Sequence, residues 1–589
     1  MSVIAGQMLP HPSGAHLTAA RGRARTSRIA FAGTCVLIAA APFEASRPLI
    51  QVPGQAVSSV EAVLFLVLAM WVASLMSARE RPAWKAPLTL PWALFLVLML
   101  IAAAAAPASR INALHMVGRL SLAFSVYLLT LNGITTASRL RSLLTVGASI
   151  GTLVSLIAIL EYAGVPLVLD ALRLFRPGIA VVGAQVRAAG PFQYPTIASM
   201  YLEILFAFSV GLLLMAIDAR ERRRAFVFAT APLVIAEAIT LTFTRAGLIT
   251  MGSTIAIVGA IRLRRHGADA GVKALAVIAL AVAAALVTSR SVESLRLRLT
   301  TEGRGRWYHA TFDAPLQLAM TTGEIREVPV TVTNAGLTTW DQAADLPYRL
   351  SYHWLLSDED AVVSWEGLQT GFPAPVPPGG TASLVVRVEA PNRPGEYRLL
   401  WDIEQGHRLW FSSEPDAELF ASRVGVSGPE LHAGSWRVMP FPRREVRPGR
   451  VVLWRTAARM LRARPVVGIG PDNFRLMYGR YAGLINADTR VHANDMYIEM
   501  LVGGGLAAGA AFAWLCWRAL TQFLRTARAA ATPQIVSAGA AAAAAGAAIA
   551  LHGVVDSFLS FTPTYILIAV TLGLGAGSGA LNGSHADRL

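Results

Sequence analysis

The sequence predicts a polytopic α-helical membrane protein with one large external loop that contains a β-sandwich. Runs of about 20 apolar residues recur along the chain, and this length matches the hydrocarbon core of a bilayer. Only 15% of the 589 residues are charged, whereas soluble proteins carry about a quarter. A polar stretch, residues 290–489, separates two groups of apolar runs and contains alternating strand-like segments.

About twelve membrane helices are expected, nine before the polar stretch and three after it. The boundaries follow the apolar runs, and the alanine-rich run near residue 540 is the weakest because alanine is barely apolar enough to insert. The expected helices are Ile29–Phe43, Val57–Met76, Pro87–Ala106, Ala113–Leu131, Leu143–Gly164, Thr196–Ile217, Ala225–Thr242, Ala246–Ile261, Val272–Val287, Met496–Trp517, Pro533–His552 and Phe558–Gly577.

Basic residues predict the orientation. Arginines precede the first helix, and further Arg and Lys residues fall in alternate loops, all on one side if the helices alternate. That side is expected to be the cytoplasm. The expected segments are a cytoplasmic tail 1–28, helices 29–289, an external insert 312–427, external loop helices 428–495, helices 496–579 and a cytoplasmic tail 580–589.

Ionisable residues recur near the outer ends of these helices. Such residues are costly in a membrane and usually mark function, although long side chains near helix ends can also reach the interface. Together they indicate one outward-facing polar cavity. They are Arg119, Glu161, Glu203, Glu237, Arg245 and Glu499, with Glu61 and His552 nearby.

The external region has two parts. Residues 312–427 alternate apolar and polar positions between Gly, Pro and Asn turns, which is typical of an immunoglobulin-like β-sandwich. Its tryptophans could stack on sugars, but core packing is the better interpretation. Residues 447–490 contain an amphipathic helix, and "GIGPDNF" is interpreted as a turn with close backbone packing, since it lacks the glycines of a phosphate loop.

Four stretches in this order resemble the O-antigen ligase and polymerase family. They are "VRAAGPFQYPTIASMYLEI", "TFTRAGLITM", "RVVLWRTAARMLRARPVVGIGPDNFRLMY" and "HANDMYIEMLVGGGL". The resemblance covers most of the membrane part and excludes the insert. It implies metal-independent, inverting transfer of a glycan from an undecaprenyl-diphosphate carrier to an acceptor hydroxyl, on the outer face of the bacterial inner membrane.

The resemblance and the chemistry indicate the same candidate catalytic residues. Arg187 and Arg245 match motif arginines, and guanidinium groups suit a diphosphate leaving group because they carry a permanent charge on a planar fork. Histidine has the basicity needed to accept the acceptor's proton near neutral pH. His492 is therefore the expected base.

Further candidates surround these three. Arg119 is a third possible anion contact, and Asn494, Tyr497 and Glu499 lie beside the histidine in the family pattern, with Pro195 near a sugar contact. Two departures stand out. In many members of the family the histidine directly precedes the asparagine, whereas here Ala493 separates His492 from Asn494. Thr196 occupies a position where the family often has asparagine.

The expected partners are the lipid-linked glycan donor, a lipid A core, glycan or protein acceptor, and membrane lipids. No cofactor and no metal are expected. Nucleic-acid binding is disfavoured despite the net charge of +16, because most arginines lie in short loops between apolar runs. A polymerase of the same family, a small-anion transporter and an adhesion or sensor protein that displays the insert are the alternatives. A transporter would need midplane polar groups and paired interrupted helices.

Overall fold

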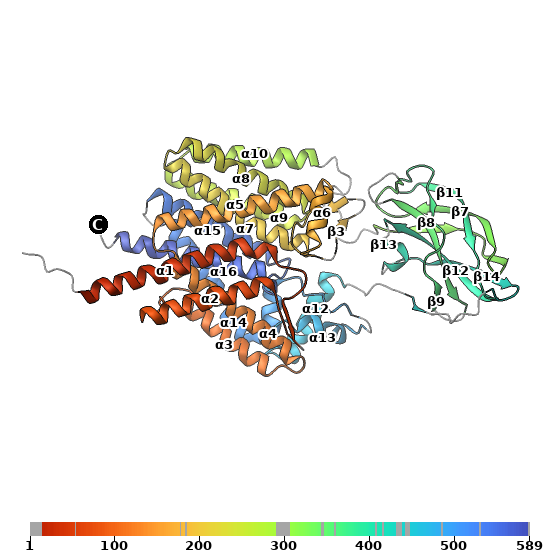
Figure 1. The fold of residues 1–589 in the computed structure, drawn as a ribbon, viewed down its shortest axis with the longest axis horizontal. Coiled ribbons are helices and arrows are strands. Elements are labelled where there is room, and N and C mark those ends of the chain that lie inside the picture. Colours follow the sequence, from red (N-terminus) through yellow and green to blue (C-terminus); the bar gives the residue numbers. More distant parts are fainter. Residues whose placement is uncertain are drawn as a thin grey trace, which may run out of the picture.

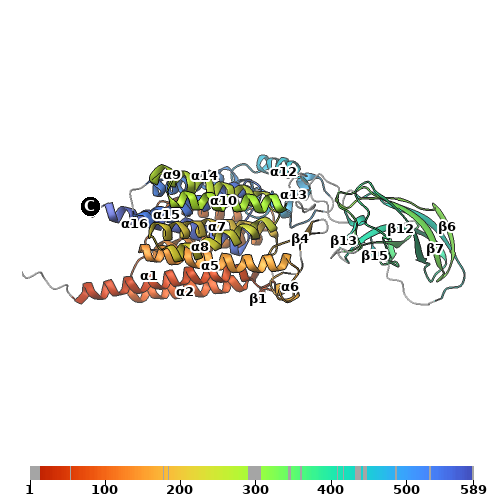
Figure 2. The ribbon, with the colours of Figure 1, turned by 90° about the horizontal axis from the view of Figure 1, so that it is seen from above.

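A computed structural model of the chain shows a bundle of long apolar helices and a separate β-sheet region (Figure 1). It describes residues 14–289, 307–431, 439–441 and 448–586, apart from short gaps at 53–54, 177, 179, 183–184, 343–346, 358–360, 407–408, 415–416, 485–486 and 529–531. Figures 1 and 2 show the bundle helices running along the long axis of the molecule, with the strands beyond one end.

Ten helices in the described part of the chain are long and apolar enough to cross a membrane, and α3 and α10 are apolar but offer shorter stretches. The chain is therefore a multi-pass membrane protein. The bundle helices are α1 (Gly14–Ala40), α2 (Ser59–Ala78), α3 (Thr89–Ala104), α4 (Arg110–Gly133), α5 (Ala137–Tyr162), α7 (Pro195–Asp218), α8 (Arg222–Leu241), α9 (Arg245–His266), α10 (Ala270–Ser289), α14 (Met496–Arg528), α15 (Pro533–His552) and α16 (Thr562–Ala586).

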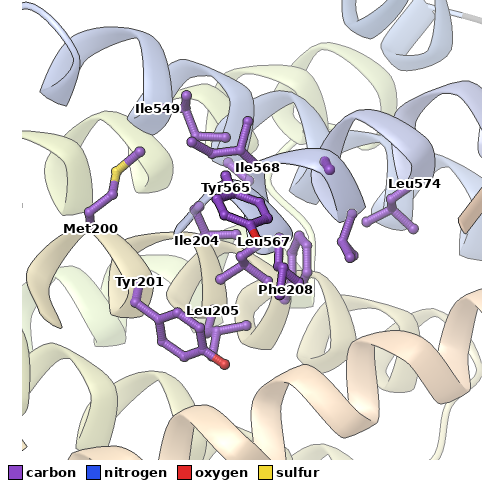
Figure 3. Packing of buried hydrophobic residues seen from close by; sticks show 14 of the residues in the cluster. Met200, Tyr201, Ile204, Leu205, Phe208, Ile549, Tyr565, Leu567, Ile568 and Leu574 are labelled. Atoms are coloured by element: carbon purple, nitrogen blue, oxygen red, sulfur yellow. The ribbon is translucent and has the colours of Figure 1, made fainter. Parts of the chain in front are cut away.

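Helix α7 lies at the centre of the bundle and is buried on nearly every side. Its apolar residues pack against those of α15 and α16, as Figure 3 shows for Ile204 and Phe208 beside Tyr565 and Leu567 of α16. Small residues allow the close approach: a Cβ on Gly211 would lie 2.5 Å from that of Ala541. The alanine-rich run is thus a buried bundle helix, where close packing supplies what alanine lacks in hydrophobicity.

Several predicted helix boundaries differ from the structure; for example, α5 begins at Ala137 instead of Leu143, and α14 ends at Arg528 instead of Trp517. The first helix begins at Gly14, within the segment expected to be a tail, because the sequence before Ile29 is rich in alanine and arginine, both good helix formers. The last helix extends to Ala586, into the segment 580–589 expected to be a second tail.

Salt bridges join the loops at one end of the bundle. Arg141 pairs with Glu221, and Arg262 lies 2.6 Å from both Asp218 and Asp269. The opposite end carries η1 (Ala41–Phe43), α6 (Pro166–Leu172) and two short hairpins, β1–β2 (Ile50–Val52, Gln55–Val57) and β3–β4 (Ala180–Val182, Gln185–Arg187). The helices α12 (Arg450–Ala463) and α13 (Phe474–Ala482) also lie there, on the side of the strands (Figure 1).

Helix α14 is interrupted at Gly505, whose φ of 68° is outside the helical region. The preceding loop fills the break: Ile469 and Gly470 donate hydrogen bonds to the carbonyls of Val502 and Gly503, and Leu506 donates one to Pro465. A Cβ on Gly505 would lie 2.2 Å from the Val466 carbonyl oxygen, so only glycine fits. The "GIGPDNF" segment therefore has close backbone packing, as predicted.

The β region consists of two sheets around one hydrophobic core. The strands are β5 (Ala310–Asp313), β6 (Gln317–Thr321), β7 (Ile325–Asn334), β8 (Tyr348–Leu356), β9 (Ala361–Ser364), β10 (Thr370–Gly371), β11 (Thr381–Glu389), β12 (Gly395–Gln405), β13 (Leu409–Trp410), β14 (Phe420–Ser427) and β15 (Met439–Pro440). The larger sheet has eight strands, with β15-β9-β8-β12-β14-β6 as its main order, and the smaller has the order β11-β7-β5. Alternate residues of β7 and β11, such as Val330 and Val386, meet Tyr352 and Trp401 of the larger sheet.

The tryptophans of this region divide by position. Trp340, Trp354 and Trp401 are buried in the shared core, as the packing interpretation predicted. Trp365 and Trp410 are partly exposed, and their ring centroids lie 5.9 Å apart.

The β region should be removable. Its core contains no residue of the helix bundle, so each part buries its own apolar surface. We expect a variant in which a short Gly/Ser linker replaces residues 310–427 to accumulate in membranes at close to the wild-type amount, measured by fluorescence-detected size-exclusion chromatography. The control is a substitution at the exposed Val385, which should be harmless. If the deletion variant aggregates and the control does not, the two parts fold together.

Candidate active site

His492 lies in the loop before α14, and two carboxylates hold its ring. The His492 Nδ1 atom is 3.4 Å from Glu499 Oε1 and 3.9 Å from Asp472 Oδ1, and the side chain is 17% exposed. This contact assigns the Nδ1 proton to the Glu499 side, which leaves Nε2 as the nitrogen able to accept a proton.

The first turn of α14 keeps this loop in place. Glu499 Oε1 accepts a hydrogen bond from the Ala493 amide at 2.6 Å, and Asp495 Oδ1 caps the helix by accepting one from Ile498 at 2.9 Å. Asn494 has a φ of 52°, which asparagine tolerates better than most residues. Ala493 is buried, so the residue that separates histidine from asparagine occupies a packed position.

The environment of His492 favours the protonated ring. Burial alone would lower the pKa of His492, but the hydrogen bond and charge of Glu499, together with the charge of Asp472, raise it above its ordinary value. Arg475 opposes this effect and in turn binds Asp472, with Nε 2.9 Å from Oδ2. The neutral imidazole is therefore more basic than usual, and the two carboxylates stabilise the imidazolium that forms when it accepts a proton.

Tyr497 and Pro195 both make contacts within the helix bundle. The Tyr497 hydroxyl donates to the Ala550 carbonyl at 2.9 Å, which joins α14 to α15. Pro195 is buried at the first turn of α7, where a proline starts a helix without losing a hydrogen bond.

Arg187 contacts the turn between α8 and α9, which leads directly into Arg245. Arg187 is the last residue of β4, and its Nε donates to the Thr242 carbonyl at 3.0 Å. Arg245, which follows Thr242 by three residues, is the first residue of α9. Phe243, inside this turn, has a φ of 53°, an uncommon value for a bulky residue and a sign of local strain. Arg187 therefore lies beside the backbone turn that precedes Arg245.

Glu161 binds the backbone of the segment that directly follows Arg187. It is fully buried, pairs with the buried Arg176, and accepts hydrogen bonds from Ala189 at 3.0 Å and Gly190 at 2.7 Å. The sequence predicted that Glu161 belongs to an outer polar cavity, but it did not indicate Arg176, because nothing in the local pattern marks this residue as a buried partner.

This arrangement makes Glu161 important for stability. We expect Glu161→Gln to lower the free energy of unfolding by about 3 kcal/mol, because it leaves a buried guanidinium without its counter-charge. Thermal unfolding of the detergent-solubilised protein measures the effect. The control is Arg173→Gln, which removes the exposed pair with Asp170 and should change stability by less than about 1 kcal/mol. Equal effects of the two variants would contradict the prediction.

A second histidine–carboxylate pair lies between the arginine turn and the His492 loop. His552 Nδ1 is 2.9 Å from Glu203 Oε1, both side chains are 1% exposed, and Ser199 donates to the same oxygen at 2.6 Å. On one side, a Cβ on Gly247 of α9 would lie 2.4 Å from Ser199 Oγ. On the other side, Met496 donates to the carbonyl of Gly553, directly after His552, at 2.8 Å. The His552–Glu203 pair thus lies between the two parts of the candidate site, the turn before Arg245 and the loop that carries His492.

Arg119 is engaged with the protein at the same end. Its Nε lies 3.5 Å from Glu61 Oε1, and its Nη1 donates to the Ser560 carbonyl at 2.9 Å. Glu61 also caps α2 through its contact with Ser58. Arg119 therefore ties α4 to α2 and to the turn before α16, and a ligand would compete with these contacts.

An apolar groove begins beside this end of α14. It has a volume of about 1410 Å³ and runs between α9, α14, α15 and α16, from Met496 and Tyr497 to Arg264 and Arg528 at the opposite end of the bundle. Its lining is mostly Ala, Leu and Phe, so it suits a long hydrocarbon chain that lies along the helices.

No protein-family model matches the chain, and no curated protein matches it. In the described residues, no group of three or more His, Cys, Asp or Glu side chains is arranged to hold a metal ion. The site is thus defined by its own geometry: two arginines at one turn, two histidine–carboxylate pairs and an adjacent apolar groove.

Proposed function

We propose that this protein is an O-antigen ligase-like glycosyltransferase that moves a glycan from an undecaprenyl-diphosphate carrier to an acceptor hydroxyl. The observation that carries the proposal is the convergence of Arg187, Arg245 and His492 at one end of the bundle, although they lie far apart in the sequence. The acceptor would be a lipid A core, another glycan or a protein.

Each part of the site has a task in this reaction. The two guanidinium groups offer charge to the diphosphate as the glycosidic bond breaks. His492 Nε2 accepts the acceptor's proton as the new bond forms, and Glu499 stabilises the resulting imidazolium. The groove of about 1410 Å³ fits the polyprenyl chain of the donor. Neither a cofactor nor a metal ion is assigned a role, because the arginines supply the positive charge.

The proposed setting is the bacterial inner membrane, with about twelve transmembrane helices and the site on the periplasmic side. The immunoglobulin-like β-sandwich would be an insert in the same external loop. The clustering of basic residues at the end of the bundle opposite the site supports this orientation.

Labelling of single cysteines tests the orientation. In a background with Cys35 and Cys516 replaced by serine, we expect Val385→Cys to react with a membrane-impermeant maleimide in spheroplasts. Arg223→Cys, in the first turn of α8, should react only after the membrane is opened. Reaction of Arg223→Cys in intact spheroplasts would reverse the orientation and remove the site from the periplasm.

A polymerase of the same family is the second candidate, because it uses the same donor and chemistry. The lipid-linked intermediates that accumulate when the gene is deleted distinguish the two. Full-length polymer on the carrier indicates a ligase, and single repeat units indicate a polymerase. Accumulation of neither would contradict both.

A small-anion transporter is less well supported. It would need polar groups near the membrane midplane and a pair of interrupted helices. Among the described helices, α14 is broken at Gly505, but a loop fills the break, and α8 contains Pro232. Most of the ionisable contacts described above lie at the helix ends, whereas Arg119 and Glu203 lie about nine residues inside α4 and α7, in the halves nearer the candidate site.

A further inference from the structure

Arg475 lies in the first turn of α13, and its guanidinium group contacts three other parts of the chain. Its Nε and Nη2 atoms are both 2.9 Å from Asp472 Oδ2. Nη2 also donates to Asn112 Oδ1 of α4 at 2.7 Å, and Nη1 donates to the Thr489 carbonyl at 3.3 Å. One side chain thus joins a bundle helix both to Asp472 and to the segment that leads into His492.

These contacts hold Asp472 in place beside His492. Asn112 Nδ2 donates to the Asp472 carbonyl at 3.2 Å, while Arg475 binds Asp472 Oδ2. The other carboxylate oxygen, Oδ1, is 3.9 Å from His492 Nδ1, which is too far for a hydrogen bond. Glu499 Oε1 is nearer to the same nitrogen, at 3.4 Å. Asp472 is therefore a second carboxylate at the ring, bound on its far side and held short of a hydrogen bond.

Arg475 also adds a positive charge to this group. Burial lowers the pKa of His492, Glu499 and Asp472 raise it, and Arg475 lowers it. His492 interacts in addition with Asp556, in the turn between α15 and α16. Removing Arg475 would have two effects of the same sign. A positive charge would be lost, and Asp472 would no longer be held away from the ring.

We propose that Arg475 is a positioning residue for His492 that acts through Asp472. This inference rests on the proposed function. The guanidinium group holds the Asp472 carboxylate toward α4, so Glu499 remains the nearer acceptor for the Nδ1 proton. A general base must be neutral before the reaction, and a second close carboxylate would keep the ring protonated over a wider pH range. Arg475 thus preserves both the orientation of the ring and its ability to accept a proton at Nε2.

The first test measures the titration of His492 without substrate. Diethyl pyrocarbonate modifies neutral histidine, and mass spectrometry of the peptide that contains His492 gives the extent of modification at each pH. Arg475→Gln removes the cation and releases Asp472, so the midpoint should rise by roughly half a pH unit or more. Arg480→Gln, at an exposed position on the same helix, should leave the midpoint unchanged. If Arg475→Gln does not accumulate, Arg475→Met carries the same expectation.

The second test asks whether Arg475 acts through Asp472. Asp472→Asn alone should lower the midpoint, because it removes an anion beside the ring. In that background, Arg475→Gln should shift the midpoint by less than half of its effect in the wild type, since substitutions within one network are not additive. An equal rise in both backgrounds would overturn the path through Asp472. An unchanged midpoint in Arg475→Gln would overturn the positioning role itself.

Glycan transfer at different pH values supplies the third readout. Below the midpoint, Arg475→Gln should be at least about threefold slower than the wild type, because half a pH unit changes the neutral fraction of the base by this factor. The difference should narrow as the pH rises. A loss by the same factor at every pH would indicate a merely structural residue and overturn the proposal. If the wild type transfers no glycan but the midpoint shifts as expected, the proposed function fails and the positioning of His492 by Arg475 stands.

Discussion

Replacing His492 with alanine should reduce glycan transfer by about 10²–10⁴-fold, the usual contribution of a general base. Its Nδ1 faces Glu499 and Asp472, so the ring is held with Nε2 as the proton acceptor. Neither carboxylate can take over this role from its present position, because Glu499 is buried and binds the Ala493 amide, and Asp472 is bound by Arg475. Transfer is measured with purified protein, a lipid-diphosphate glycan and an acceptor.

Two further variants separate base catalysis from packing. His492→Gln keeps a side chain of similar size but cannot accept the proton, so it should be as inactive as His492→Ala. His266→Ala, at the exposed end of α9 on the opposite side of the bundle, should keep full activity. If His492→Gln keeps the wild-type activity, a group other than His492 accepts the proton of the acceptor hydroxyl. His552 would be the first to examine, although it is only 1% exposed.

Replacing Arg187 or Arg245 with lysine should reduce transfer at least about 100-fold, close to the loss of one preorganised donor to a developing anion. Lysine keeps the charge but not the planar fork that binds two phosphate oxygens. At Arg187 the change has a second cost, because its Nε holds the Thr242 carbonyl of the strained turn before Arg245. The two variants should therefore have effects that are not additive.

The matched control is Arg223→Lys, an exposed arginine at the other end of the bundle. It should leave both activity and protein amount unchanged. The wild-type rate in both Arg187→Lys and Arg245→Lys would show that the diphosphate is held elsewhere. Arg119 would then be the next candidate, despite its contacts with Glu61 and Ser560.

The order of the helices could be predicted because apolar runs of membrane length are a strong signal that depends only on neighbouring residues. Period-two alternation indicated the strands for the same reason. Several features were not predictable in this way. The break at Gly505 depends on a loop that begins about 40 residues earlier in the chain, and the start of α1 at Gly14 extends beyond the apolar run.

The residues of the candidate site likewise divide into those that the local sequence indicates and those that depend on contacts between distant parts of the chain. His492, Arg187 and Arg245 were found from residue type and motif, and the pairing of His492 with Glu499 lies within one loop and one helix turn. Arg176 and Asp472 were missed because Glu161 and His492, the groups that they contact, lie in other parts of the chain. Tyr497 and Pro195 stand in the motif, but the structure gives them packing contacts, since a motif can record what a fold needs as well as what a reaction needs.

The most direct test of the central claim is transfer by the purified protein in liposomes. The reaction contains an undecaprenyl-diphosphate oligosaccharide, a glycolipid acceptor and EDTA, with no nucleotide sugar. We predict an acceptor that carries the added glycan, together with one released undecaprenyl diphosphate for each glycan transferred. No transfer under these conditions, with activity restored only by magnesium or manganese, would contradict the arginine mechanism. No transfer with any addition of metal or alternative acceptor would contradict the proposed function.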